Sequence, residues 1–189
     1  MRRYLALLAA LAAAAALAAP ALATPAYFDF ARSTNLNSRL TLSWEAVPGH
    51  VSSMSWRAGS GTGTDECAVG RGWLPGGWYD LNGHWDNYDG SKVKGRVFYL
   101  QNKQCYNGTW RTELFIHSEE TAANGQSCPT SGDDPFCWEG DSDYYSAGCI
   151  KMSRAGNPSD LNLVHTNWHQ RSGDQRHGAF TITHWLYVH

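Results

Sequence analysis

The sequence has few basic residues and no cluster of them beyond its first three positions. Lys and Arg number 15 against 17 Asp and Glu, and the formal net charge is −2. Without Arg2 and Arg3 the remainder is more acidic still, and no basic stripe is left that could neutralise phosphates or an anionic lipid surface. We therefore expect neither nucleic acid nor an anionic membrane as a partner.

The apolar run near the N-terminus lacks the length of a membrane anchor. It extends from Leu5 to Ala19, which is shorter than the ~20 residues that a helix needs to span a bilayer. The following Ala21-Leu22-Ala23 places small residues where a signal peptidase cleaves. We expect residues 1–23 to be a secretory signal peptide, so that no stable membrane anchor remains after cleavage and the protein is secreted or extracytoplasmic.

No internal repeat and no long linker divides the rest of the chain. Residues 24–55 carry few periodic signals beyond the candidate strand TLSWEAV, and we interpret them as an N-terminal extension. The predicted domain covers residues 56–189 and is expected to be a monomer. The Gly-rich segment 59–72 lacks the Lys-Ser or Lys-Thr of a phosphate-binding loop, so we interpret it as an ordinary loop.

Aromatic and β-branched residues predict a mainly β fold. Nine Trp and nine Tyr are many for a chain of 189 residues, and such side chains suit strands and β-rich cores. Strands are predicted at 78–85, 96–102, 111–119 and 178–189, where apolar residues alternate with polar ones or Gly, Asn and Asp bound the run.

One helix is predicted after residue 157. Asn157 can cap it and Pro158 suits its first position. Leu161, Val164 and Trp168 follow at spacings of three and four, which places them on one face. We expect the helix to end near Ser172-Gly173. The predicted fold class is a β-rich α+β domain, a β-sandwich or barrel with one principal helix.

Five cysteines allow two disulfides and leave one thiol over. Cys128 and Cys137 lie close together in the long acidic segment 119–145, so proximity favours a local bridge between them. Cys67 and Cys105 then form the second pair, and Cys149 is left free. An exported protein with a lone thiol must use it, bury it or cross-link through it.

Cys149 has neighbours that suit a nucleophile. A thiol becomes reactive beside a base or a cation, and Gly148 allows a substrate or strand to approach closely. The base must come from elsewhere in the chain. His117, which ends the alternating strand 111–119, is one of eight histidines that could supply it.

The segments LFIHS (114–118) and SAGCIKM (146–152) resemble the catalytic signature of the L,D-transpeptidase domain. That signature has a histidine at the end of a strand, then a loop, then Ser-x-Gly-Cys with an aliphatic residue, Arg and an apolar residue. The segment GRGWLPGGWYDL and the helix after Met152 also resemble parts of this domain. The likeness covers roughly residues 56–169 and is most specific at 114–152.

The resemblance implies an L,D-transpeptidase-like sandwich or barrel and a definite chemistry. Cys149 would be the nucleophile and His117 its general base, with Ser146 supporting the turn. Gly148 would permit the backbone geometry, and N–H groups near Gly148 and Cys149 would form an oxyanion hole. The family cleaves peptidoglycan stem peptides through a thioester and passes the acyl group to an amine, or to water as an L,D-carboxypeptidase.

The same resemblance implies a cell-wall location and peptidoglycan stem peptides as partners, with no metal and no cofactor. Lys151, Glu119 and Tyr145 are the residues that we expect to contact substrate. Three departures from the family pattern stand out. Ala147 replaces a frequent histidine, Lys151 replaces the usual Arg, and 32 residues separate His117 from Cys149, about twice the common spacing. The long 119–145 loop accounts for the extra length, and we expect it to shape access to the site, either as a lid or by closing the site.

Three other interpretations remain open. A papain-like endopeptidase would need a base after the cysteine, from His165, His169, His177 or His184. His165 and His169 are spaced as metal ligands on the predicted helix, although we favour packing and solvent-facing roles for them. A secreted, non-catalytic binding module could present a sugar-binding aromatic surface, for which the candidates are Trp73, Trp78, Trp85, Trp110 and Trp138.

Overall fold

A computed structural model describes residues 26–129, 134–172, 178–180 and 183–189 of the chain, so the predicted signal peptide lies outside the described residues. The elements in chain order are β1 (Tyr27–Ala31), β2 (Ser38–Val47), β3 (His50–Ser60), β4 (Gly77–Asp89), β5 (Lys94–Leu100), β6 (Lys103–Gln104), β7 (Trp110–Arg111), β8 (Phe115–His117), the 3₁₀ turn η1 (Asp141–Tyr144), β9 (Ile150–Met152), α1 (Asp160–Arg171), β10 (Gly178–Ala179) and β11 (Trp185–Val188). None of the helices described is both long and apolar enough to cross a membrane.

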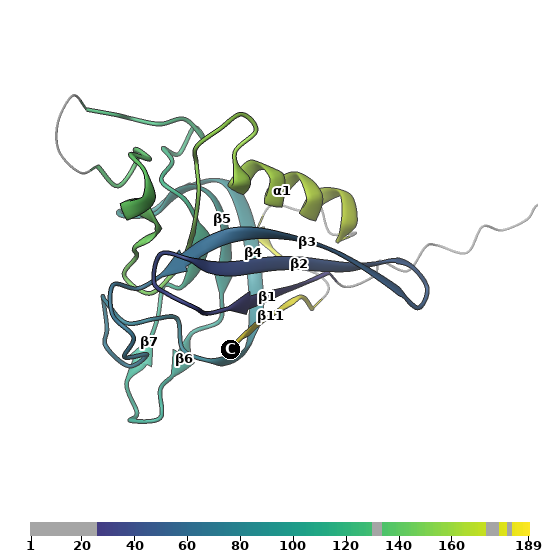
Figure 1. Cartoon of the computed structure of the whole chain (residues 1–189), viewed down its shortest axis with the longest axis horizontal. Coiled ribbons are helices and arrows are strands. Elements are labelled where there is room, and N and C mark those ends of the chain that lie inside the picture. Colours follow the sequence, from purple (N-terminus) through teal and green to yellow (C-terminus); the bar gives the residue numbers. More distant parts are fainter. Residues whose placement is uncertain (1–25, 130–133, 173–177, 181–182) are drawn as a thin grey trace, which may run out of the picture.

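Nine strands form one sheet that closes on itself (Figure 1). Their order is β10-β4-β11-β1-β2-β3-β9-β8-β5, and β5 also pairs with β4, which makes the sheet barrel-like. Most neighbours are antiparallel, but β1 pairs with β11 and β8 pairs with β9 in parallel. The described residues are therefore mainly β with one α-helix, as the sequence predicts.

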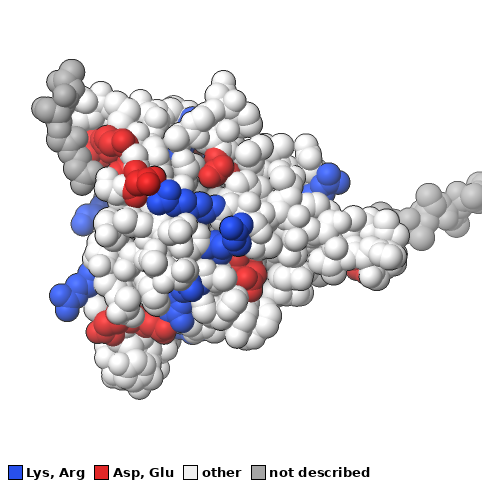
Figure 2. All heavy atoms as spheres, viewed as in Figure 1, with Lys and Arg blue, Asp and Glu red and all other residues white. Residues whose placement is uncertain are grey.

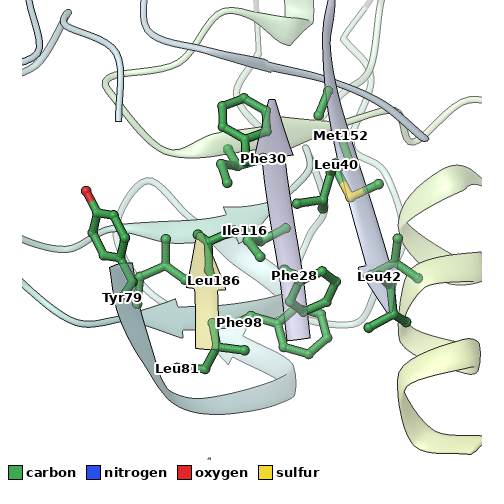
Figure 3. Packing of buried hydrophobic residues seen from close by; sticks show 14 of the residues in the cluster. Phe28, Phe30, Leu40, Leu42, Tyr79, Leu81, Phe98, Ile116, Met152 and Leu186 are labelled. Atoms are coloured by element: carbon green, nitrogen blue, oxygen red, sulfur yellow. The ribbon is translucent and has the colours of Figure 1, made fainter. Parts of the chain in front are cut away.

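The barrel interior holds the main hydrophobic core (Figure 3). Phe28, Leu40, Phe98, Ile116 and Leu186 are fully buried there and come from five different strands. Each alternates with residues that face outward, as the two-residue period of a strand requires. This core fixes which side chains of β8 and β9 point inward.

The helix α1 lies next to β2 and closes against the barrel (Figure 1). Its apolar face buries Leu161, Val164 and Trp168, as their spacing predicts. Trp168 stacks on Phe28 with ring centroids 5.3 Å apart. The predicted cap is off by two residues, because Ser159 rather than Asn157 is the N-cap and its hydroxyl accepts from the N–H of Asn162. The helix ends at Ser172, as predicted.

Residues 26–55 are not an extension, which corrects the sequence interpretation. They form β1, β2 and most of β3, and the predicted boundary before residue 56 falls inside β3. Phe28, Phe30 and Leu42 from this segment are fully buried. The role of this segment in the barrel could not be predicted from sequence, because β1 pairs with β11, which is more than 150 residues away along the chain.

Two predicted strands are shorter than expected. The predicted strand 111–119 is reduced to β8 at 115–117, since Glu113 has φ of 54° and turns the chain before it. The predicted strand 178–189 is divided between β10 and β11, with residues 181–182 outside the described part. The predicted strands 78–85 and 96–102 correspond to β4 and β5, although β4 begins and ends further out.

Both predicted disulfides are present. Cys67 joins Cys105 with Cα atoms 5.6 Å apart, and Cys128 joins Cys137 with Cα atoms 4.9 Å apart. The first bridge ties the Gly-rich loop to the segment between β6 and β7, and the second closes part of the 119–145 loop. Disulfides of this kind are typical of proteins that fold outside the reducing cytoplasm.

Candidate functional site

The parallel pair β8–β9 carries the predicted thiol and imidazole. In its register Ile116 lies opposite Ile150, and His117 lies opposite Lys151. Both isoleucines point into the barrel core, where Figure 3 shows Ile116. Because successive strand residues point to alternate faces, Cys149 and His117 both lie on the face of the pair that points away from the barrel core.

Cys149 and His117 are offset by two positions on these neighbouring strands. Cys149 precedes Ile150, and His117 follows Ile116. With a rise of ~3.3 Å per residue and ~4.8 Å between strands, their Cα atoms lie roughly 8 Å apart. The fold therefore places both side chains on the same face of the pair, offset diagonally, from segments separated by the whole 119–145 loop. Lys151 is the residue directly opposite His117, and His117 is not among the residues that line the Cys149 cavity.

Cys149 is the unpaired cysteine and it is buried. Its Sγ–H donates to the carbonyl of Glu113 at 3.6 Å. Burial raises the pKa of this thiol to about 11, although the N–H of Phe115 and the charges of Arg111 and Lys151 act in the opposite direction. At neutral pH the resting sulfur is therefore a thiol rather than a thiolate.

His117 is buried and neutral. Its Nδ1 lies 2.9 Å from the carbonyl oxygen of Ser118. A carbonyl only accepts, so Nδ1 carries the ring proton and Nε2 keeps a free electron pair. Burial and the nearby charge of Lys151 lower the pKa of His117 to about 4. The imidazole is thus in the form that can take a proton from a thiol.

The turn before Cys149 depends on Ser146 and Gly148. The Ser146 hydroxyl donates to the carbonyl of Cys149 at 2.7 Å and accepts from the N–H groups of Gly148 and Gly61. Gly148 has φ of 121°, and a Cβ there would lie 1.8 Å from Nη2 of Arg111. Any other residue at 148 would therefore be strained and would displace Arg111.

Two backbone N–H groups near Cys149 have partners within the protein. The N–H of Gly148, one of the oxyanion donors that the family resemblance implies, is bonded to the hydroxyl of Ser146 at 3.1 Å. The N–H of Phe115, on the neighbouring strand, faces the sulfur of Cys149 and favours its thiolate form. The motif alone did not reveal this second donor.

Arg111 is a residue of the site that the sequence did not indicate. It is 2% exposed, and its guanidinium donates to backbone carbonyls of two distant loops. The acceptors are Glu66, Gly72, Trp73 and Ala147. No local pattern marks such a residue, because its partners lie 36 to 45 positions away along the chain.

Cys149 opens onto a cavity of about 390 Å³. Tyr88, Phe115, Arg111 and Glu113 contribute to its wall. Val97 and Phe115 pack with Cys149 in a small apolar cluster at its base. A substrate that reaches the sulfur would therefore lie against aromatic surface with one buried cation nearby.

The three residues predicted to contact substrate line a different cavity. Lys151, Glu119 and Tyr145 border a space of about 640 Å³, which does not include Cys149 among its lining residues. Lys151 and Glu119 form an ion pair, with side-chain exposures of 12% and 4%. The Lys151 charge is thus neutralised internally. Burial raises the pKa of Glu119 to about 7 despite this pairing.

The 119–145 loop shapes the Lys151 cavity and not the Cys149 cavity. Pro135, Glu139, Asp143 and Tyr145 of this loop line the larger space. Glu120 anchors the start of the loop. Its side chain is fully buried, and its carboxylate forms ion pairs with Arg96 and Arg154, at 2.9 and 2.7 Å. None of the described residues of the loop lines the Cys149 cavity, so the loop shapes access to the Lys151 cavity instead.

The histidines needed by a papain-like site lie elsewhere. His184 is fully buried against Trp168, with ring centroids 4.5 Å apart, and its Nδ1 is 3.1 Å from the carbonyl of Ala26. His165 and His169 are on α1 near Asp86. His177 lies outside the described residues. The Cys149 cavity is lined by none of the three described histidines.

One described group of side chains could hold a metal ion by its donor types. His84 and Asp86 of β4 meet His165 and His169 of α1. The second group of potential ligands, Glu119, Glu139 and Asp143, belongs to the Lys151 cavity. Neither group includes Cys149 or His117.

The tryptophans do not share one exposed surface. Trp78 and Trp110 are 61% and 57% exposed, whereas Trp73, Trp85 and Trp138 are half-buried. On the face shown in Figure 2, Lys and Arg side chains are interspersed with Asp and Glu. That face therefore carries no extended patch of a single charge sign among the described residues.

Comparison of the chain with protein-family models, with curated proteins and with solved structures found no match. The geometry of β8 and β9 and the residues that resemble the L,D-transpeptidase signature are therefore the basis on which a function can be inferred.

Proposed function

We propose that this chain is an exported cysteine acyltransferase of the L,D-transpeptidase type, acting on peptidoglycan stem peptides in the cell wall. One observation carries the proposal: an unpaired thiol and a neutral imidazole lie on the same face of two adjacent parallel strands. The segments that bring them there are the ones that resemble the family signature. The two disulfides support a location outside the cytoplasm.

The first half of the reaction forms a thioester. Nε2 of His117 takes the proton of the Cys149 thiol as the sulfur attacks the carbonyl carbon between the third stem residue and D-alanine. The same imidazole then gives this proton to the departing amine of D-alanine. The C–N bond breaks, and the tripeptide remains on the sulfur as a thioester.

The second half releases the acyl group. An amine of another stem peptide attacks the thioester carbon and gives its proton to His117, and the C–S bond breaks. The proton returns from His117 to the sulfur, so the thiol is regenerated. If water is the acceptor, the same steps make the protein an L,D-carboxypeptidase.

The resting pair carries no net charge and the two groups are not bonded to each other. The thiol donates to Glu113, and Nδ1 of His117 donates to Ser118. Burial raises the pKa of the thiol to about 11 and lowers that of the imidazole to about 4, which opposes proton transfer between them at rest. The proposal therefore requires that bound substrate bring the two groups together and their pKa values closer, as catalytic hydrogen bonds often form only in the complex.

Two cavities at neighbouring positions of β9 suit two substrates. Cys149 lines one and Lys151 lines the other. In the proposed reaction the acyl donor occupies the Cys149 cavity, beside Arg111. The amine acceptor approaches from the acidic Lys151 cavity, where Glu119, Glu139 and Asp143 favour a positively charged group.

Intact-mass measurement tests the proposal directly. The purified chain, with both disulfides formed, is incubated with a tetrapeptide stem ending in D-alanine, and the reaction is quenched in acid. We expect the protein mass to rise by one tripeptide acyl group, with one D-alanine released per chain. Cys149→Ala should keep its melting temperature within a few degrees and show no adduct.

Two results would refute the assignment. One is an adduct that persists in Cys149→Ala. The other is a folded wild-type protein that releases no D-alanine and whose native thiol stays inert, as expected of a non-catalytic binding module.

A further inference from the structure

A cluster of three histidines and one aspartate joins α1 to β4 on residues that the proposed reaction does not use. His84 and Asp86 are two positions apart on β4, and His165 and His169 are four apart on α1. One donor atom from each of the four lies within 4.8 Å of the others. Strand spacing and helix spacing thus direct two pairs of donors at one point.

The distances within this cluster are those of metal ligands rather than of good hydrogen bonds. Oδ1 of Asp86 is 3.4 Å from Nδ1 of His165 and 3.6 Å from Nε2 of His169. N–H···O bonds in proteins are usually about 2.7–3.2 Å long. Two donors that each lie about 2.1 Å from a tetrahedral zinc are separated by roughly 3.4 Å.

The burial of His165 gives independent support. This residue is 3% exposed, and neither of its ring nitrogens makes a hydrogen bond within the part of the chain that the structure describes. Its Nδ1 approaches only Asp86, at the long distance given above. Buried polar nitrogens are almost always bonded, so an under-bonded imidazole needs an explanation.

The surroundings are compatible with a bound cation. The cluster borders a cavity of about 380 Å³, which gives an ion access from solvent. Arg96 also lines this cavity, but its guanidinium pairs with Glu120 at 2.9 Å. Asp86 contributes one negative charge, so the ion would not be held by neutral ligands alone.

We propose that His84, Asp86, His165 and His169 bind one zinc ion and thereby attach α1 to the barrel. Three imidazole nitrogens and one carboxylate oxygen fill a tetrahedral shell, which makes the site structural rather than catalytic. The ion joins α1 to β4, and its ligands on the two elements are at least 165 − 86 = 79 positions apart in sequence. This inference does not depend on the proposed acyl transfer.

Metal binding can be measured without any activity assay. Metal is removed from the disulfide-bonded chain with EDTA, and the protein is dialysed and titrated with Zn²⁺ alone. Bound zinc is quantified by inductively coupled plasma mass spectrometry. We expect one zinc per chain and a melting temperature that rises by several degrees on binding. Co²⁺ in place of zinc should give the intense visible absorption of a tetrahedral site.

Two variants and one control locate the ion. His169→Ala removes a half-exposed ligand, and Asp86→Asn keeps the size of its side chain, so both should fold without metal. Each should weaken zinc binding at least tenfold. His50→Ala, at an exposed position at the start of β3, should bind zinc as the wild type does.

The proposal is overturned if the folded wild type binds no zinc at micromolar concentration. It is also overturned if both ligand variants retain wild-type affinity, since the ion would then lie elsewhere. Circular dichroism in EDTA verifies that each variant is folded before its affinity is measured.

Discussion

The two cavities beside β9 differ in the charge of the groups that line them, although Cys149 and Lys151 are only two positions apart. The Cys149 cavity holds a neutral thiol over an apolar cluster that includes Phe115. The Lys151 cavity holds a buried ion pair with Glu119 and two further carboxylates. The difference shows that a thiol held neutral by burial can lie two positions along the chain from a buried ion pair.

The largest expected effect tests whether His117 belongs functionally to the Cys149 cavity. His117→Asn keeps a polar side chain but removes the base, so the rate of acyl-enzyme formation should fall on the order of 10²–10⁴-fold. Stopped-flow mixing followed by intact-mass analysis measures this rate. His184→Asn should leave the rate unchanged in molecules that remain folded. Equal losses in the two variants would contradict the assignment.

The second test breaks the charge balance of the Lys151 cavity. Lys151→Met leaves the Glu119 carboxylate buried without its partner, and we expect a loss of roughly 3 kcal/mol in the free energy of unfolding. Urea denaturation measures it. Replacing both residues, as Lys151→Met with Glu119→Leu, should restore most of the loss because no buried charge is left. A double variant as unstable as the single one would show that the ion pair is not what the site requires.

A smaller effect is expected at the turn that separates the cavities. Gly148→Ala places a Cβ against Arg111 in a backbone conformation with φ of 121°. We expect it to cost about 1–3 kcal/mol and to displace the guanidinium. Gly108→Ala is the matched control, since φ is 85° there and nothing lies within 4 Å of the added Cβ. The difference between the two variants isolates the clash with Arg111, and equal costs would argue against it.

The smallest effect is expected from changing pH near neutrality. His117 must be neutral to act as a base, and its pKa is about 4 in the folded protein. The rate of acylation should therefore be nearly constant from pH 6 to 8 and should fall only as the pH drops toward 4 and His117 is protonated. Measuring the rate against pH tests this. A fall centred near 6.5, the usual value for histidine, would indicate that the imidazole is exposed to solvent in the working state.

Features that depend on neighbours in sequence could be predicted, whereas those that depend on distant contacts could not. The buried face of α1 follows from Leu161, Val164 and Trp168, and the bridge from Cys128 to Cys137 follows from their proximity. The place of β1 beside β11 was missed, because nothing in residues 27–31 identifies a partner at 185–188.

The same distinction applies to the candidate site. Cys149 and His117 belong to short segments that could be compared with a known signature. Arg111 and Glu113 contact the thiol region through folding of the chain between β7 and β8 and carry no local pattern. His84 and Asp86 meet α1 only because β4 passes beside it, so the spacing of His165 and His169 on the helix revealed half of the donors.

The position of β11 between β1 and β4 has a consequence for how the barrel assembles. Residues 185–188 pair with residues 27–30 on one side and with residues 77–80 on the other. Until these segments meet, the facing edges of β1 and β4 have no partner and the sheet stays open. Closure of the barrel is therefore a long-range step that cannot begin from any one local segment of the chain.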